Sequence, residues 1–227
     1  MTYDINQRFE FLGSLTSMVV SEITPSLIVT GEGGLGKTFT VMSIVKSLLD
    51  EGDYVSFKGY STARGLFNTL YDNNGKLIIF DDCDSVLEDK VALNILKSAL
   101  DSYETRKISW MAMARNDEYP QHFDFTGRII FISNKDKSTL DGAVLSRSLV
   151  VDLTMTPADK ISRMKSILGD IAPEYDMSIK NDALSFLDKR KDSVNLNMRT
   201  LIMVSKIRYS YPESWESLAG YMISSMV

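Results

Sequence analysis

The sequence of 227 residues contains a single cysteine, Cys83, and a single histidine, His122. One cysteine excludes a disulfide within the chain, which is typical of a reducing compartment, and we expect a cytoplasmic protein. One cysteine and one histidine are too few ligands for a zinc site, so a structural metal is not expected.

Long apolar runs are also missing. No stretch approaches the roughly 18 consecutive apolar residues that indicate a transmembrane helix, and residues 1–10, MTYDINQRFE, lack the basic-then-apolar pattern of a secretory signal. We therefore expect no membrane partner. The formal net charge of −5 argues against a surface that is basic throughout and binds nucleic acid anywhere.

The chain does have a glycine-rich motif, GEGGLGKT, at residues 31–38. The apolar run 27–29 precedes it, and apolar residues at helical spacing follow it. The motif matches G-x-x-x-x-G-K-[ST] without a break. Its glycines let successive backbone N–H groups turn toward phosphate oxygens, where a Cβ would obstruct the approach. The pattern predicts a phosphate-binding loop between a strand and a helix.

The residues that end this motif have complementary chemistry. Lys37 can reach the outer phosphates, and the Thr38 hydroxyl can hold a magnesium ion. The helix that begins at Lys37 turns its positive dipole end toward the phosphates. We therefore predict that the chain binds a nucleoside triphosphate with Mg²⁺. The expected nucleotide contacts are Gly31, Glu32, Gly33, Gly34, Leu35, Gly36, Lys37, Thr38 and Phe39.

A second apolar strand, predicted at 77–80, runs into the acidic residues Asp81, Asp82 and Asp84. We expect Asp81, with Thr38, to hold the magnesium ion, and Asp82 to orient or deprotonate the attacking water. The alternative is that these acids only cap the following helix, where negative charge is favoured. Asp84 is predicted to be such a cap.

A third polar position follows the strand predicted at 128–132. Ligands of a doubly wound sheet lie at the carboxyl ends of its strands. If this strand lies between those at 27–29 and 77–80, Asn134 points at the γ-phosphate and the attacking water. Otherwise Asn134 is a turn residue of the segment 133–136.

The apolar runs predict five strands and a change of architecture near residue 157. Strands this apolar are typical of a parallel sheet covered on both faces, and from Pro157 the apolar period becomes helical throughout. We expect an α/β core at 1–156, including an N-terminal helix, and a small all-helical lid domain at 157–227. The predicted strands are 27–29, 54–57, 77–80, 128–132 and 149–153.

Together, the glycine-rich motif, the Asp81-Asp82 strand end and Asn134 resemble an AAA+ ATPase over roughly residues 25–210. LSRS at 145–148 resembles a Ser-Arg segment of clamp-loader subunits, which implies that Arg147 reaches the ATP of a neighbouring subunit. NMRTL at 197–201 resembles the sensor-2 segment, which implies that Arg199 contacts the γ-phosphate of its own subunit. The resemblance implies a P-loop NTPase sheet with strand order 5-1-4-3-2 and a homo-oligomeric ring or partial ring.

The chain departs from the AAA+ pattern at Asp82, where the family usually has glutamate. Aspartate is shorter by one methylene, and a base about 1 Å further from its water could lower the rate on the order of 10²-fold. Slow hydrolysis is therefore expected unless the backbone lies closer to the water.

Two segments occupy places where AAA+ proteins contact their substrates. The loop 58–64, with Tyr60 and Arg64, follows the second strand, where a pore loop is common. The segment 107–126, with Arg115, Tyr119 and His122, occupies the place of a hairpin that some AAA+ helicases carry. Such aromatic and basic residues could stack on bases and follow a phosphate backbone or pull on a peptide, and either segment could instead be an ordinary connector.

The function expected from this resemblance is ATP hydrolysis coupled to remodelling or translocating a macromolecule, in DNA replication or processing by a phage- or plasmid-type protein. One alternative is a monomeric P-loop kinase for a nucleotide or metabolite, which would leave the set of Asp81, Asp82 and Asn134 unexplained. Another is an ATP-gated switch or scaffold that hardly hydrolyses, which Asp82 alone favours.

Overall fold

The computed structural model describes residues 3–59, 61–101, 106–111, 119–192 and 196–225. Contacts divide the chain into two units. The sheet unit contains Phe9–Gly31 and Lys37–Leu153, and the helical unit contains Met1–Arg8, Glu32–Gly36 and Thr154–Val227. Residues 32–36 of the phosphate loop thus belong to the helical unit, whereas Gly31, Lys37 and Thr38 belong to the sheet unit. The domain boundary predicted between residues 156 and 157 stays a prediction.

The sheet unit is built on five parallel strands in the order β2-β3-β6-β1-β7. This confirms the predicted α/β fold and its strand order. Every residue of the three central strands is buried, because these strands have neighbours on both sides and helices on both faces. The strands are β1 (Ser26–Thr30), β2 (Tyr54–Lys58), β3 (Leu77–Asp81), β6 (Arg128–Ile132) and β7 (Leu149–Asp152).

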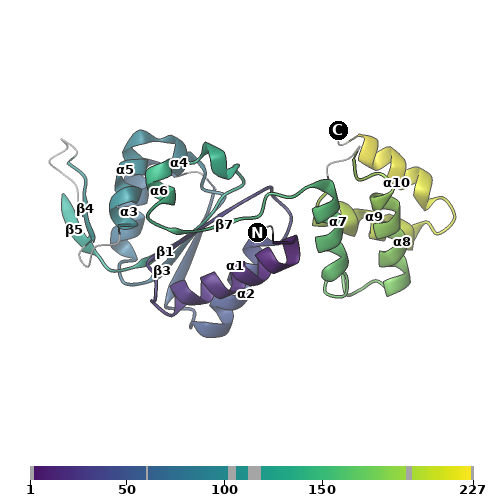
Figure 1. The fold of residues 1–227 in the computed structure, drawn as a ribbon, viewed down its shortest axis with the longest axis horizontal. Helices are drawn as coiled ribbons and strands as arrows, with labels where there is room; N and C mark the ends of the chain where they lie inside the picture. The colour runs from purple at the N-terminus through teal and green to yellow at the C-terminus, as the bar shows by residue number, and fades with distance from the viewer. Residues whose placement is uncertain (1–2, 60, 102–105, 112–118, 193–195, 226–227) are drawn as a thin grey trace. The chain divides into compact units, whose positions relative to one another are not determined.

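Helices cover both faces of this sheet. Figure 1 shows α1 and α2 on one face and α3 and α5 on the other. The segment after β3 forms two helices, since α4 ends at Glu88 and α5 starts at Lys90. The carboxylate of Asp89 between them accepts from the first backbone N–H groups of α5 and so caps a new helix. The helices are α1 (Ile5–Val20), α2 (Lys37–Leu48), α3 (Ala63–Asp72), α4 (Ser85–Glu88), α5 (Lys90–Ala99), the 3₁₀ turn η1 (Lys137–Thr139) and α6 (Gly142–Leu145).

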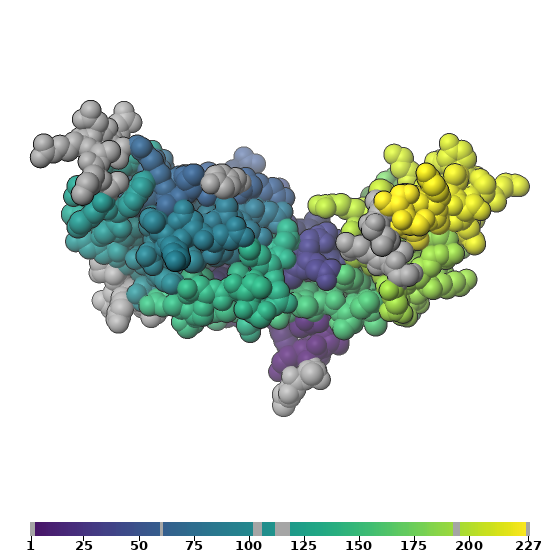
Figure 2. All heavy atoms as spheres, turned by 90° about the horizontal axis from the view of Figure 1, so that it is seen from above, coloured from purple at the N-terminus to yellow at the C-terminus, as the bar shows by residue number. Residues whose placement is uncertain are grey.

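A small antiparallel ribbon, β4 (Arg106–Ser109) and β5 (His122–Phe125), extends from the sheet unit. It is drawn in teal at the left of Figures 1 and 2. The ribbon packs on α3 through rings, because Phe123 lies 5.3 Å from both Phe67 and Tyr71, measured between centroids. β5 has no counterpart among the strands predicted from the sequence.

The helical unit contains α7 (Pro157–Ser166), α8 (Met177–Asp188), α9 (Met198–Ser210) and α10 (Trp215–Ser224), as the helical periodicity predicted. It has its own apolar core, to which Met164, Leu187, Leu201 and Ile223 contribute. Local signals fix where the helices begin. Pro157 opens α7 behind the capping box of Thr156 and Asp159, which satisfies two backbone N–H groups at once.

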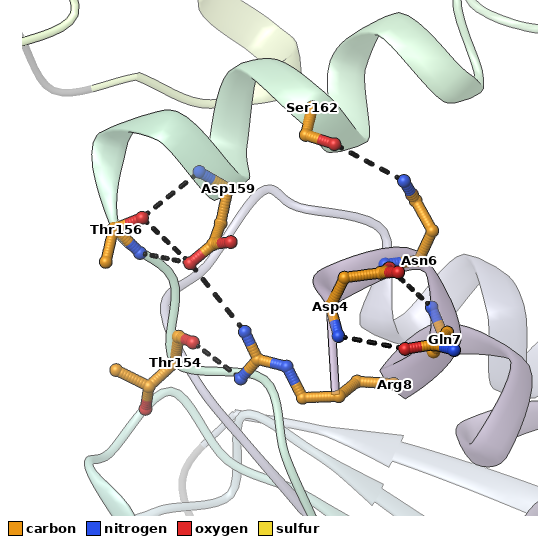
Figure 3. A network of polar contacts seen from close by, with 8 residues as sticks. All are labelled: Asp4, Asn6, Gln7, Arg8, Thr154, Thr156, Asp159 and Ser162. Carbon is orange, nitrogen blue, oxygen red and sulfur yellow. Dashed lines mark hydrogen bonds and ion pairs between the residues drawn. The ribbon is translucent and has the colours of Figure 1, made fainter. Parts of the chain in front are cut away.

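The start of α1 joins the helical unit through polar contacts (Figure 3). The Arg8 guanidinium donates to the Thr154 carbonyl at 2.8 Å and lies 3.8 Å from the Asp159 carboxylate. The Asn6 amide donates to the Ser162 hydroxyl on α7. Residues 4–8 and residues 154–162, far apart in the sequence, therefore build one polar network around the start of α7.

Candidate nucleotide-binding site

The glycine-rich loop has the backbone that its sequence predicts. Gly31, Gly34 and Gly36 have φ values of 129°, 76° and 98°, in the region that residues with a Cβ rarely adopt. Space also limits position 34 to a small residue, since a Cβ at Gly34 would lie 3.2 Å from the Asn197 side chain. The loop therefore needs glycine at these turns.

Within the helical unit, this loop contacts the start of α9. The Met198 N–H donates to the Gly34 carbonyl at 2.9 Å, and the Asn197 side chain caps α9 by accepting from Thr200 N–H. On α7, the Lys160 ammonium donates to the Glu32 carboxylate. The loop is thus held by two helices of its own unit.

Lys37 and Asn134 meet at the carboxyl edge of the sheet. The Lys37 ammonium, on a side chain that is almost fully buried, donates to the Gly31 carbonyl at 2.6 Å and to Asn134 Oδ1 at 2.9 Å. Asn134 Nδ2 donates in turn to the Asp82 carboxylate. The reverse amide orientation would set the Asn134 NH₂ against an ammonium, so the network fixes which way the amide points. A chain of hydrogen bonds therefore runs from Lys37 through Asn134 to Asp82.

The strand order explains this convergence. β6 lies between β1 and β3, and Asp81 is in register with Ile132. The next residue, Asp82, donates its N–H to the Ile132 carbonyl at 3.0 Å. Asp82 has a φ of 56°, a left-handed conformation that aspartate tolerates better than most residues. Asp82 and Asn134 therefore leave adjacent strands side by side.

The residues predicted to hold magnesium also lie together. The Thr38 hydroxyl donates to Asp81 Oδ1 at 2.8 Å, and the Asp81 side chain is 3% exposed. A hydroxyl and a carboxylate are the hard oxygen donors that Mg²⁺ takes, and in phosphate-transfer sites it needs only one or two carboxylates besides substrate phosphates and water. The described residues contain no group of three or more His, Cys, Asp or Glu side chains able to hold a metal. The pair fits a magnesium ion that is bound together with nucleotide.

Cys83 and Asp84, which follow Asp82, have structural roles. The Asp84 side chain makes no capping hydrogen bond to α4, so the predicted cap is wrong. It accepts instead from the Ser133 hydroxyl at 2.6 Å and so ties the segment after β3 to the end of β6. Burial, together with the nearby Asp81 charge, raises the pKa of the Cys83 thiol to about 11, which makes this thiol a poor nucleophile at neutral pH.

Comparisons with known proteins agree with this arrangement. No protein-family model matches the chain. Over an alignment of 241 positions, the chain is 30% identical to an uncharacterised 36.7 kDa protein from the nrdC-mobD intergenic region of enterobacteria phage T4. The alignment covers 96% of this chain and 74% of the phage protein. The chain belongs to the family of this T4 protein.

Comparison with solved structures identifies the fold of this chain. It is similar to RuvB of Thermotoga maritima, with a TM-score of 0.53 and 17% identity over 89% of this chain and 61% of RuvB. NtrX of Brucella abortus in complex with ATP also gives 0.53, with 12% identity over 90% of this chain and 51% of NtrX. For PCH-2 of C. elegans the TM-score is 0.50, with 16% identity over 97% of this chain and 68% of PCH-2. All three are AAA+ P-loop ATPases, and this family member has the AAA+ P-loop fold.

The chain spans about three fifths of the RuvB chain and about half of the NtrX chain. No helix among the described residues is long and apolar enough to cross a membrane.

The two predicted arginines belong to other elements than those that carry Lys37, Asn134 and Asp82. Arg147 follows α6 and bends back onto its own chain, where its Nη1 donates to the Ala143 carbonyl at 2.9 Å and its Nε lies 3.9 Å from the Asp101 carboxylate. Arg199 is the second residue of α9, in the helical unit, and its side chain is exposed. Their roles toward nucleotide stay predictions.

The remaining predicted residues differ in exposure. Leu35 is buried in the glycine-rich loop, whereas Phe39 on α2 is 75% exposed. Arg64 on α3 and His122 on β5 are exposed, and the Tyr119 hydroxyl donates to the Asp72 carboxylate at 3.0 Å. Tyr60 and Arg115 lie outside the described residues.

Sequence reasoning missed one residue at this edge. Lys58 was assigned only to the loop after the second strand, but it is the last residue of β2 and its ammonium lies 2.7 Å from Asp81 Oδ2. The strand order places β2 beside β3, in register from Tyr54 opposite Leu77 to Lys58 opposite Asp81. Aligning the ends of the two predicted strands could have found this pair.

Proposed function

We propose that this protein binds ATP with Mg²⁺ at the carboxyl edge of its sheet and hydrolyses it to ADP and phosphate. The observation that carries the proposal is the hydrogen-bonded chain from Lys37 through Asn134 to Asp82, and Lys37 follows a loop whose glycines have the required backbone. A phosphate-binding cation, an orienting amide and a carboxylate base are the groups that an in-line attack by water needs.

Each group has a defined task in this mechanism. Backbone N–H groups of the glycine-rich loop and the Lys37 ammonium bind the phosphates, while Thr38 and Asp81 hold the magnesium ion. When bound, the ion neutralises charge on the β- and γ-phosphate oxygens. The Asp82 carboxylate orients the attacking water and takes its proton, and the Asn134 amide holds Asp82 in place and can donate toward the γ-phosphate.

We propose further that the active form is a homo-oligomer in which Arg147 serves a neighbouring subunit. A guanidinium that reaches the transferred phosphoryl group is worth about 10³–10⁵ in rate. Arg147 now contacts Asp101 and the Ala143 carbonyl of its own chain, and a partly exposed ion pair at 3.9 Å is weak, about 0–1 kcal/mol. The side chain can therefore be recruited to an interface at small cost. Arg199 would contact the γ-phosphate of its own subunit.

The work coupled to hydrolysis is proposed to be remodelling or translocating a macromolecule in DNA replication or processing. RuvB, which has the same fold, is described as a Holliday junction branch migration motor. The exposed side chains of Lys107 and His122 on the ribbon, and Arg64 on α3, are of the kinds that follow a phosphate backbone and stack on bases. A phage relative agrees with the phage-type origin expected from the sequence.

Phosphate release with and without Mg²⁺ tests the catalytic proposal. Lys37→Ala should weaken ATP binding by at least about tenfold, because a buried cation at the phosphates is lost. Lys46→Ala is the matched control, since Lys46 lies exposed in the last turn of the same helix and should bind ATP like the wild type. Equal affinities in the two variants would contradict the phosphate-site assignment, and binding without any turnover would indicate an ATP-gated switch.

The substrate is tested by measuring phosphate release in parallel with single-stranded DNA, duplex DNA and an unfolded protein. The proposal expects stimulation by one of the two DNAs. Stimulation by the unfolded protein alone would assign the coupled work to proteins instead.

A further inference from the structure

Lys58 and Asp81 form an ion pair whose two side chains differ greatly in solvent exposure. Lys58 Nζ lies 2.7 Å from Asp81 Oδ2, while Asp81 Oδ1 accepts from the Thr38 hydroxyl. The Asp81 side chain is 3% exposed, but the Lys58 side chain is 66% exposed. The carboxylate is therefore fixed inside the protein and its cationic partner reaches it from solvent.

This asymmetry has an energetic consequence. A buried carboxylate is costly unless it is paired and hydrogen-bonded, and the Thr38 hydroxyl supplies a hydrogen bond but no charge. The Lys58 ammonium supplies the charge. A divalent ion bound to the same carboxylate would repel this ammonium, and an exposed lysine can move into water at little cost.

We propose that Lys58 is a positioning residue that neutralises and orients Asp81 while no metal is bound and releases the carboxylate when Mg²⁺ binds with nucleotide. This inference rests on the proposed function, because it takes Asp81 as a magnesium ligand. Lys58 keeps the ligand in place for the ion, and it makes the ion compete for the site. Metal binding then depends on the end of β2 as well as on Thr38 and Asp81.

The test is the affinity of Mn²⁺ for the protein saturated with a non-hydrolysable ATP analogue, measured by electron paramagnetic resonance of free Mn²⁺. Lys58→Met keeps the length of the side chain and removes the competing charge, so Mn²⁺ should bind about tenfold tighter, which corresponds to about 1.4 kcal/mol. Lys135→Met is the matched control, because Lys135 follows Asn134 at the same edge but pairs with Glu88 at 2.6 Å. The control should change Mn²⁺ affinity less than about twofold.

A second measurement uses the metal-free protein. In EDTA and without nucleotide, Lys58→Met should lower the melting temperature by about 2–6 °C, because Asp81 loses its counter-charge. The Lys58→Arg variant keeps the positive charge and should therefore keep a melting temperature close to that of the wild type. In an Asp81→Asn background, Lys58→Met should have no effect, since the two residues act as a pair.

The outcomes separate this inference from the proposed function. If Asp81→Asn binds Mn²⁺ as well as the wild type does, Asp81 is not a metal ligand and both fail. If Asp81→Asn binds Mn²⁺ weakly while Lys58→Met matches its control, only the role of Lys58 is overturned. If Lys58→Met instead weakens binding of the analogue in EDTA, Lys58 contacts phosphate and the competition proposed here is wrong.

Discussion

The carboxyl edge of the sheet and the two predicted arginines differ in how far one chain determines their geometry. At the edge, Lys37, Asn134 and Asp82 are joined by hydrogen bonds in an order that fixes the Asn134 amide. Arg147, by contrast, rests 3.9 Å from Asp101 of its own chain, and Arg199 is exposed at the start of α9. Side chains that act within a subunit can be held by that subunit's strands. Arg147 is proposed to serve a neighbour, and it would then acquire its working position only at an interface.

The largest effect should come from Arg147, which is proposed to act on the ATP of another subunit. Arg147→Ala should lower kcat by about 10³-fold or more and leave ATP affinity within about twofold, because the guanidinium contributes only to the transition state. Steady-state phosphate release and ATP titration measure the two quantities. Retained binding also shows that the variant folds.

Mixing experiments sharpen this comparison. If Arg147 acts in trans, adding Arg147→Ala subunits to a fixed amount of wild type should lower the activity per wild-type subunit. Arg190→Ala is the control, since Arg190 lies over the Phe186 ring at 3.8 Å in the helical unit, and it should leave activity unchanged. Loss of ATP binding in Arg147→Ala, or activity equal to wild type, would show that the arginine has another role.

A smaller effect is expected at the edge itself. Asp82→Asn removes the proposed base but keeps an acceptor for Asn134, so ATP should still bind while kcat falls about 10²–10⁴-fold. The neighbouring acid provides the control, because Asp84 accepts from Ser133 and has no proposed contact with nucleotide. Asp84→Asn should retain most of the activity. Similar losses in both variants would mean that charge near the edge matters, and not a base at Asp82.

Much of this edge could be predicted because its determinants are local in sequence. A glycine motif between an apolar strand and a helix, and polar residues at the ends of apolar strands, suffice to bring Lys37, Asp81 and Asn134 together once the strand order is known. The partner of Asp84 could not be predicted, since aspartate before a helix usually caps it, and only the position of Ser133 decides otherwise.

The features that were missed depend on tertiary neighbours. β5 is short, and the contacts of Phe123 are rings on α3, which no local pattern in 106–126 specifies. The break at Asp89 arises because its side chain can begin a new helix, although the apolar period continues past it. The contact of Lys58 with Asp81 depends on the register of β2 with β3.

The smallest effect is expected where the glycine-rich loop meets α9. Asn197→Ala removes the cap on α9 and should destabilise the protein by about 1 kcal/mol, a fall in melting temperature of about 2–4 °C for a chain of this size. Thermal unfolding followed by circular dichroism measures it, and Asn197→Asp, which keeps the acceptor for Thr200 N–H, should remain near wild type. Because the Met198 N–H to Gly34 carbonyl bond is between backbone atoms, the loop keeps that contact in both variants, and ATP affinity should change less than about threefold. A large loss of ATP binding in Asn197→Ala alone would mean that this side chain, packed against Gly34, helps to shape the phosphate loop.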